Sequence, residues 1–463
     1  MRGAPYIIEG VLSRPHMVRF GALVACMLAI ACSPGNQPCA KAEKRGPIAW
    51  IEDDYGAALA CARAKKVPLV LDMWAPWCHT CLSMQTTVFM DNAFAGDATK
   101  FVFAAIDTER EANAEAVGKF APSAWPTFYV IGTDESVLAR FIGAASVQQF
   151  REFLDSGARA AAGGGAAADA RFLGGQRALS KKDFATADTE FTAALGMAPE
   201  TWPHRAEALH AAILAKSKLG DTTGCLDLAD KYLDAAGTSA LATNFVKSGL
   251  GCASKSTDAA RVTAFRDRGI KRLQTILADK SAPLSIDDRA EALGYLRDAL
   301  DESGKPADAK QVAEQLRTLL DDAMAKATTP LAKMTHLWLR AEVYAYLKRP
   351  LDLVHDYEAL ARELPKEYEP RARLGWLYLQ GGKYTEAAKW TDEALALVYG
   401  PRKGRLLAQR AEIAKAAGDV ATERKYREQA VKLWESLPPA QRSQENLEKA
   451  QAALAAVGSG SAR

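Results

Sequence analysis

The feature that most constrains this chain is a pair of cysteines, Cys78 and Cys81, directly after the apolar run at residues 67–74. The run predicts a buried strand, and the residues after Cys78 predict a helix. Cys78 then lies at a strand-to-helix turn, where free N–H groups and the helix dipole favour a thiolate. Cys81 follows one turn later, within reach of a disulfide. This spacing predicts that Cys78 attacks a substrate disulfide and that Cys81 resolves the mixed disulfide.

Two cysteines at this spacing also form half of some zinc sites. No second C-x-x-C and no paired histidines follow, and the whole chain has only six histidines. The sequence therefore predicts a redox pair and no metal site. A net charge of +3 gives no basic footprint for nucleic acid.

The residues around the pair resemble one family. DMWAPWCHTC (residues 72–81) is similar to the active-site segment of thioredoxin, and SAWPTFYV (residues 123–130) to the segment that carries its cis-proline. The resemblance spans about residues 50–157. Residues 82–91 are similar to the branch that contains the C-terminal domain of the periplasmic thiol:disulfide interchange reductase. The resemblance implies an α/β thioredoxin fold, a mixed central sheet flanked by helices.

The resemblance also implies roles for single residues. Asp72 would be a buried proton acceptor or donor near the second cysteine, because burial raises the pKa of a carboxyl toward neutrality. Pro126 would be cis and would shape a groove that pairs with substrate backbone. Trp125 is larger than the residue usual in the family and would crowd that groove. Trp77 would offer apolar surface to a partner or pack in the core.

His79 and the threonine after it replace the Gly-Pro of ordinary thioredoxin. A protonated His79 beside Cys78 would stabilise the thiolate and raise the reduction potential. The alternative is an exposed, neutral imidazole. The family's lysine near the buried aspartate is missing, with Phe103 near its place, so Asp72 would titrate without that cation. No cofactor beyond the redox disulfide is expected.

The N-terminus resembles an export signal of the bacterial lipoprotein type. Arg14 and Arg19 precede the apolar residues 20–31, and LAIACSPGN follows the pattern of a lipoprotein cleavage site. The resemblance implies a signal peptide at 1–31, lipidation at Cys32, and a membrane-anchored protein of the cell envelope facing the periplasm. Two alternatives are an ordinary cleaved signal and cleavage at Cys26, which would leave a short apolar run. No apolar run reaches the roughly 20 residues of a membrane span.

The rest of the chain divides by composition. We expect a tether at 32–48, the thioredoxin-like domain at 49–157, a flexible linker at 158–170, helices at 171–455 and a disordered tail at 456–463. Residues 50–66 are expected to be helical. Cys39 in the tether is expected to be a spare, exposed thiol, and Cys61 a small buried core residue.

Alanine and leucine dominate after residue 171, with Gly or Pro breaks at about every 15 residues, which predicts paired helices. LGWLY at 374–378 with GKYTEAA at 382–388, and a weaker unit from Gly175, resemble tetratricopeptide repeats. Such units fold only as a stack, whose concave face is the usual binding surface. Cys225 and Cys252 form a disulfide or remain two unrelated buried thiols.

These inferences lead to one main hypothesis. It is an exported, membrane-anchored thiol:disulfide oxidoreductase whose helical repeats recruit a protein partner across a flexible joint. Its partners would be protein thiols or disulfides and an upstream electron donor or acceptor protein. A reductase is favoured, because the branch resembled is a reducing one. The alternative is a repeat-based scaffold or chaperone of an envelope complex with a thioredoxin-like adaptor domain; an isomerase would need a dimer.

Overall fold

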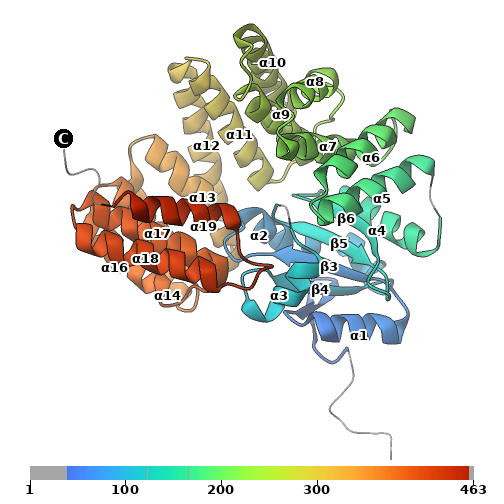
Figure 1. Cartoon of the computed structure of the whole chain (residues 1–463), viewed down its shortest axis with the longest axis horizontal. Helices are drawn as coiled ribbons and strands as arrows, with labels where there is room; N and C mark the ends of the chain where they lie inside the picture. Colours follow the sequence, from blue (N-terminus) through green and yellow to red (C-terminus); the bar gives the residue numbers. More distant parts are fainter. Residues whose placement is uncertain (1–38, 123, 165, 458–463) are drawn as a thin grey trace, which may run out of the picture.

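The computed structural model describes residues 39–122, 124–164 and 166–457. The chain folds into two domains (Figure 1). We call the segment from β1 to α4 the sheet domain and the segment from α5 to α19 the helical domain. The predicted signal peptide and Cys32 lie outside the described residues, as does most of the predicted tail. In the part of the chain that is described, no helix is both long and apolar enough to span a bilayer.

The sheet domain is built on six strands in the order β1-β2-β4-β3-β5-β6. β2, β4 and β3 are parallel, while β1, β5 and β6 run antiparallel to their neighbours. The central strands β3 and β4 are buried almost throughout, as expected for strands covered on both faces. The strands are β1 (Ala42–Arg45), β2 (Ile48–Glu52), β3 (Leu69–Trp74), β4 (Val102–Asp107), β5 (Thr127–Ile131) and β6 (Val137–Ile142).

Helices cover both faces of this sheet. Side chains of α1 and α3 pack on one face with Leu71 and Tyr129. Side chains of α2 and α4 pack on the other face with Phe103 and Phe128. The helices are α1 (Tyr55–Lys65), α2 (His79–Thr86), α3 (Ala114–Lys119) and α4 (Val147–Ala161), with short 3-10 turns η1 (Val88–Met90), η2 (Asn92–Ala95) and η3 (Glu111–Asn113). The mixed sheet flanked by helices confirms the predicted fold class.

The predicted tether is wrong where the structure describes it. Residues 42–45 form β1, which pairs with β2 and extends the sheet by one edge strand. Cys39 is not a spare thiol, because it forms a disulfide with Cys61 of α1. The helix expected from residue 50 begins only at Tyr55. The residues before it form β2, which is mostly buried and pairs with β4. Asp54 then caps α1 by accepting a hydrogen bond from the N–H of Ala57.

The helical domain consists of antiparallel helix pairs, as the repeat pattern predicts. Gly175 of α5 faces the ring of Phe191, and Gly375 of α15 faces Thr391, so closely that a Cβ atom would clash. Small residues therefore let the paired helices cross, as in tetratricopeptide-like units. The helices are α5 (Ala167–Ser180), α6 (Phe184–Met197), α7 (Arg205–Leu219), α8 (Thr222–Tyr232), α9 (Ala240–Ala253), α10 (Ala259–Ala278), α11 (Ile286–Glu302), α12 (Pro306–Lys326), α13 (Pro330–Tyr346), α14 (Val354–Glu363) after the 3-10 turn η4 (Pro350–Leu353), α15 (Glu369–Gln380), α16 (Tyr384–Leu395), α17 (Gly400–Ala416), α18 (Val420–Ser436) and α19 (Gln444–Ala455).

The linker expected at 158–170 is mostly helical. α4 continues to Ala161 and α5 begins at Ala167, because the alanines of this segment favour helix. The expected tail also begins late, since the carbonyl of Val457 accepts a hydrogen bond from Arg424. Only a short connection thus separates the sheet domain from the helical domain.

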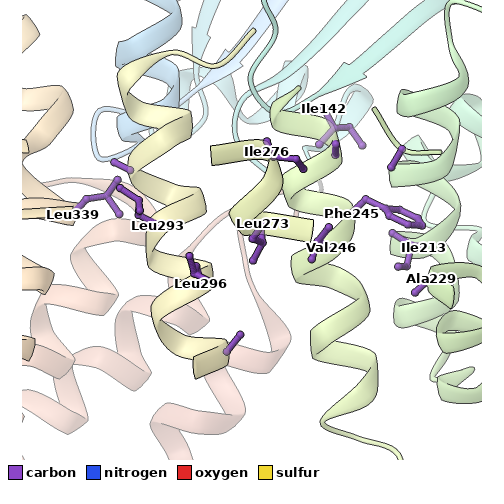
Figure 2. Close-up of a cluster of buried hydrophobic side chains, with 14 of the residues drawn as sticks. Ile142, Ile213, Ala229, Phe245, Val246, Leu273, Ile276, Leu293, Leu296 and Leu339 are labelled. Carbon is purple, nitrogen blue, oxygen red and sulfur yellow. The ribbon is translucent and has the colours of Figure 1, made fainter. Parts of the chain in front are cut away.

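The helical domain curves around the sheet domain, from α5 beside β6 to α17 and α18 beyond α3 (Figure 1). At the first end, Arg177 of α5 donates to the carbonyl of Val137 at 3.0 Å. Ile142 of β6 belongs to the same buried cluster as Phe245 and Ile276 of the helical domain (Figure 2). In the middle, α2 packs against α13. The two domains are docked on one another. The prediction of a flexible joint between them is therefore wrong.

Candidate active site

Cys78 and Cys81 form a disulfide at the start of α2, with 5.2 Å between their Cα atoms. Cys78 is the N-cap residue, and its Sγ accepts from the backbone N–H of Cys81 at 3.0 Å. Cys78 is 4% exposed and Cys81 is 1% exposed. The sulfur that would carry negative charge after reduction is therefore the one beside the helix N-terminus, which is the arrangement that lowers the pKa of a thiol.

Asp72 lies on β3, the strand that leads into the cysteine motif, and is 1% exposed. Burial raises the pKa of Asp72 to about 7, and the positive charge of Arg45 partly opposes this rise. Arg45 belongs to β1 and pairs with Glu52 at 2.6 Å. We expected no cation near Asp72, but Arg45 provides one. It lies on β1, in the segment predicted to be a tether. Phe103 packs on Trp50 instead.

The Trp125–Pro126 peptide bond is cis, as the resemblance implies. Pro126 is buried directly before β5. The indole N–H of Trp125 donates to the hydroxyl of Thr108 at 2.9 Å, and its ring meets that of Trp77 edge-on at 5.2 Å. Trp74, Trp77 and Trp125 pack together against the cysteine pair. Trp125 therefore does not crowd the groove alone, because it packs with two other tryptophans against the disulfide.

Comparison with known proteins agrees with this geometry. Residues 50–132 match a protein-family model described as thioredoxin-like. The sheet domain is a thioredoxin-like domain. It is followed by tetratricopeptide-like helices, as the sequence resemblance implied. No curated protein matches the chain significantly.

Several solved structures resemble part of the chain. A tetratricopeptide repeat protein from Parabacteroides merdae is 13% identical, with a TM-score of 0.40, over 62% of this chain and 98% of its own. Yeast Tom70 is 16% identical, with a TM-score of 0.30, over 62% of this chain and 64% of its own. The assembly chaperone of RpL4, Acl4, is 14% identical, with a TM-score of 0.30, over 63% of this chain and 97% of its own.

The helical domain covers the active-site end of the thioredoxin-like domain. Between Trp77 and His79 on one side and α13 and α15 on the other, the packing leaves a cavity of only about 10 Å³. This is no more than the space that one water molecule needs. In this arrangement Trp77 and His79, two of the four residues expected to contact substrate, instead contact the helical domain of the same chain.

His79 is the first of these contacts. Its Nδ1 lies 2.9 Å from Oδ1 of Asp287 on α11, and its Nε2 lies 3.5 Å from Oε1 of Glu291. Burial alone would lower the pKa of His79, but these two carboxylates raise it to about 9. The imidazole is therefore charged at neutral pH.

Trp77 is the second contact. Its indole N–H donates to Oε1 of Glu109 at 2.8 Å, and the guanidinium groups of Arg402 and Arg405 lie 5.9 and 5.4 Å from its ring centre. The other carboxylate oxygen of Glu109 accepts from the backbone N–H of Arg402 in the first turn of α17. Glu109 thereby caps a helix of the other domain, although burial raises its pKa to about 7.

Further residues of this interface were not anticipated from the sequence. The hydroxyl of Tyr399 donates to Asp107, and the side-chain amide of Gln441 donates to the carbonyls of Thr108 and Arg110 at 2.9 and 2.8 Å. Gly400 has a φ of +58°, and a Cβ there would lie 1.9 Å from the carbonyl oxygen of Glu109. Only the Gly-Pro start of α17 hinted at a special position; the other residues look like ordinary surface residues in the sequence.

The other four cysteines among the described residues form two disulfides away from the active site. Cys225 of α8 and Cys252 of α9 form a disulfide inside the helical core, so the structure has the first of the two alternatives left open. Within residues 39–457, apart from the two undescribed positions, no group of three or more metal-binding side chains gathers.

Proposed function

We propose that this protein is an exported, membrane-anchored thiol:disulfide oxidoreductase that acts as a reductase through Cys78 and Cys81. One observation carries the proposal: a disulfide whose first sulfur sits at a helix N-terminus and accepts the N–H of Cys81. The cis peptide bond before Pro126 and the buried carboxyl of Asp72 support it.

In the proposed reaction the reduced Cys78 thiolate attacks one sulfur of a substrate disulfide. A bond forms between Cys78 and that sulfur, and the other substrate sulfur leaves as a thiolate that takes up a proton. Asp72 then accepts the proton of the Cys81 thiol, for which a pKa of about 7 is well matched. The Cys81 thiolate attacks Cys78, the second substrate thiolate leaves, and two electrons have passed to the substrate. An upstream electron donor protein would reduce the disulfide again.

We further propose that the protein lies in the bacterial cell envelope, anchored by lipid on Cys32 and facing the periplasm. Two disulfides outside the active site, Cys39–Cys61 and Cys225–Cys252, support an oxidising compartment. The helical domain would bind a protein partner, since helical arrays commonly do. Its surface toward the thioredoxin-like domain is already in use, so the partner would bind elsewhere on the array or replace that contact.

A second candidate function is a scaffold in which the thioredoxin-like domain serves as an adaptor. The observation that favours it is the use of Trp77 and His79 as contacts between domains. An adaptor, however, has no need for a reactive cysteine at a helix N-terminus with a buried carboxyl on the adjoining strand.

The reduction potential of the Cys78–Cys81 pair tests both proposals. The chain from residue 39 would be equilibrated with glutathione, and each cysteine would be followed by mass-tagging and peptide mapping. A potential near thioredoxin's roughly −270 mV supports the reductase. A value near about −120 mV, typical of strong periplasmic oxidants, reverses the direction of the proposed reaction. A pair that does not cycle leaves the scaffold as the better hypothesis.

A further inference from the structure

The contact between His79 and α11 joins the redox motif to the other domain. We infer that Asp287 is a positioning residue for the redox pair: it holds the His79 side chain as an imidazolium beside Cys78, so that the docked helical domain helps to set the reactivity and potential of the disulfide. This inference rests on the proposed function and deepens it.

The geometry is that of a charged imidazole. Both carboxylate oxygens of Asp287 lie close to Nδ1, at 2.9 and 3.0 Å, and Glu291 faces Nε2. A neutral imidazole has only one N–H to donate, whereas an imidazolium has two. With a carboxylate facing each ring nitrogen, the site matches the protonated form.

Asp287 is arranged for this contact. Its side chain is 1% exposed, against 17% for His79, so the carboxylate is withdrawn from water by the docked interface. It lies in the first turn of α11, where the helix dipole favours a negative charge. Ser285 and Asp288 already form the capping box of α11. The carboxylate of Asp287 is therefore not required for capping and is directed to His79.

The charges around His79 come from three elements of the helical domain. α11 contributes Asp287, Asp288 and Glu291, α13 contributes His336 and Glu342, and α15 contributes Arg373. Burial and Arg373 lower the pKa of His79, and the carboxylates raise it. Asp287 raises it more than Glu291 does, and burial outweighs Glu291. Asp287 is therefore the main group that opposes burial and keeps the buried imidazole protonated.

His79 follows Cys78 directly in the chain, so its charge acts on the sulfur that must become a thiolate. Reduction adds two electrons to the disulfide and yields a Cys78 thiolate and, with one proton, a Cys81 thiol. A neighbouring imidazolium favours that thiolate and hence the reduced pair. Asp287 stabilises the imidazolium through Nδ1, and it is present only while the two domains are docked.

The test compares Asp287→Asn with Asp298→Asn, the same change on an exposed carboxylate of α11 that faces Arg297. Two quantities are measured in the chain from residue 39. They are the pKa of Cys78, from the pH dependence of its alkylation, and the equilibrium of the Cys78–Cys81 pair with glutathione at pH 7. For Asp287→Asn we expect a higher Cys78 pKa and an equilibrium shifted about tenfold toward the disulfide. This shift corresponds to a reduction potential about 30 mV more negative. Asp298→Asn should match the wild type.

A double-mutant cycle separates positioning from a merely structural effect. His79→Gln should shift the equilibrium in the same direction, and adding Asp287→Asn to it should shift it no further. Wild-type values in Asp287→Asn, or shifts that add, overturn the inference. If Asp287→Asn does not fold, Glu291→Gln replaces it, with a smaller shift in the same direction expected and no shift overturning the inference. A wild-type pair that does not cycle overturns the proposed function instead.

Discussion

Two disulfides of this chain, Cys78–Cys81 and Cys225–Cys252, are equally hidden but differ in their surroundings. All four cysteines are 4% exposed or less. Cys225 and Cys252 lie among apolar side chains of α7 to α10, where a thiolate would find little stabilisation. Cys78 lies at a helix N-terminus, with His79 beside it and Asp72 on the adjoining strand. Burial alone therefore does not tell a reactive pair from a structural one; the placement of charge does.

The largest difference should appear when each pair is removed. We expect Cys78→Ser to abolish exchange with glutathione disulfide, because the attacking sulfur is lost and Cys81 is only 1% exposed, while Cys225→Ala/Cys252→Ala retains it. The rate at which reduced glutathione is released, quantified as its alkylated derivative after separation from the protein, measures this. Activity that persists in Cys78→Ser would place the reactive thiol elsewhere.

The stability of the helical domain should show the converse. The Cys225–Cys252 bridge closes a loop of 27 residues, and its loss should cost about 3–4 kcal/mol by loop-closure entropy. Urea unfolding followed by circular dichroism, with Cys225→Ala/Cys252→Ala against wild type, measures the change. An unchanged midpoint would mean that the bridge adds nothing to the packing of α8 and α9.

A smaller effect is expected at Asp72. Asp72→Asn removes the proton acceptor without changing the size of the side chain, so resolution of the mixed disulfide should slow about 100-fold. Burial raises the pKa of Asp72 to about 7, so the wild-type rate should rise with pH through neutrality and the variant rate should lose that rise. Rapid-quench trapping of the mixed disulfide gives both rates. Equal rates in both proteins would remove Asp72 from the mechanism.

The smallest effect should be a pH dependence of domain docking. Burial in the docked state raises the pKa of Glu109 to about 7, so its contribution is intact near pH 4.5 and is lost as the pH rises through 7. The raised pKa of His79 gives a contribution that is intact below 6.5 and lost as the pH rises through about 9. Both make docking weaker at alkaline pH.

Hydrogen exchange at the start of α17, corrected for intrinsic rates, should therefore show about tenfold less protection at pH 8.5 than at pH 5.5, or about 1.4 kcal/mol. Glu109→Gln should reduce this pH dependence, with Glu111→Gln, an exposed neighbour, as its control. Protection that increases with pH would contradict the expected direction.

The sequence predicted the parts that depend on local pattern. The apolar run before Cys78 became β3, and the segment around Pro126 has the cis bond that the resemblance implied. It did not predict β1, since four mostly exposed residues carry little apolar signal. The disulfide between Cys39 and Cys61 was missed for the same reason, because without β1 nothing brings these cysteines together.

The docking of the domains could not be read from the sequence for a different reason. Glu109, Asp287 and Gln441 are polar residues that would look the same on a solvated surface. Their partners lie far away along the chain, and a single sequence gives no measure of such distances. The glycine-rich segment near residue 164 suggested that the two domains move freely relative to one another. Their relative position is instead fixed by contacts elsewhere in the chain.

The hydrogen bonds from Gln441 to the loop after β4 span 333 and 331 residues of chain. They also bear on the order of events during synthesis. The thioredoxin-like domain is complete long before Gln441 emerges from the ribosome, and domains generally fold as they are made. Each new molecule would then pass through a stage in which the cysteine pair is folded but uncovered. Its first encounters with oxidants, reductants and foldases would take place at that stage, before the last helices close over it.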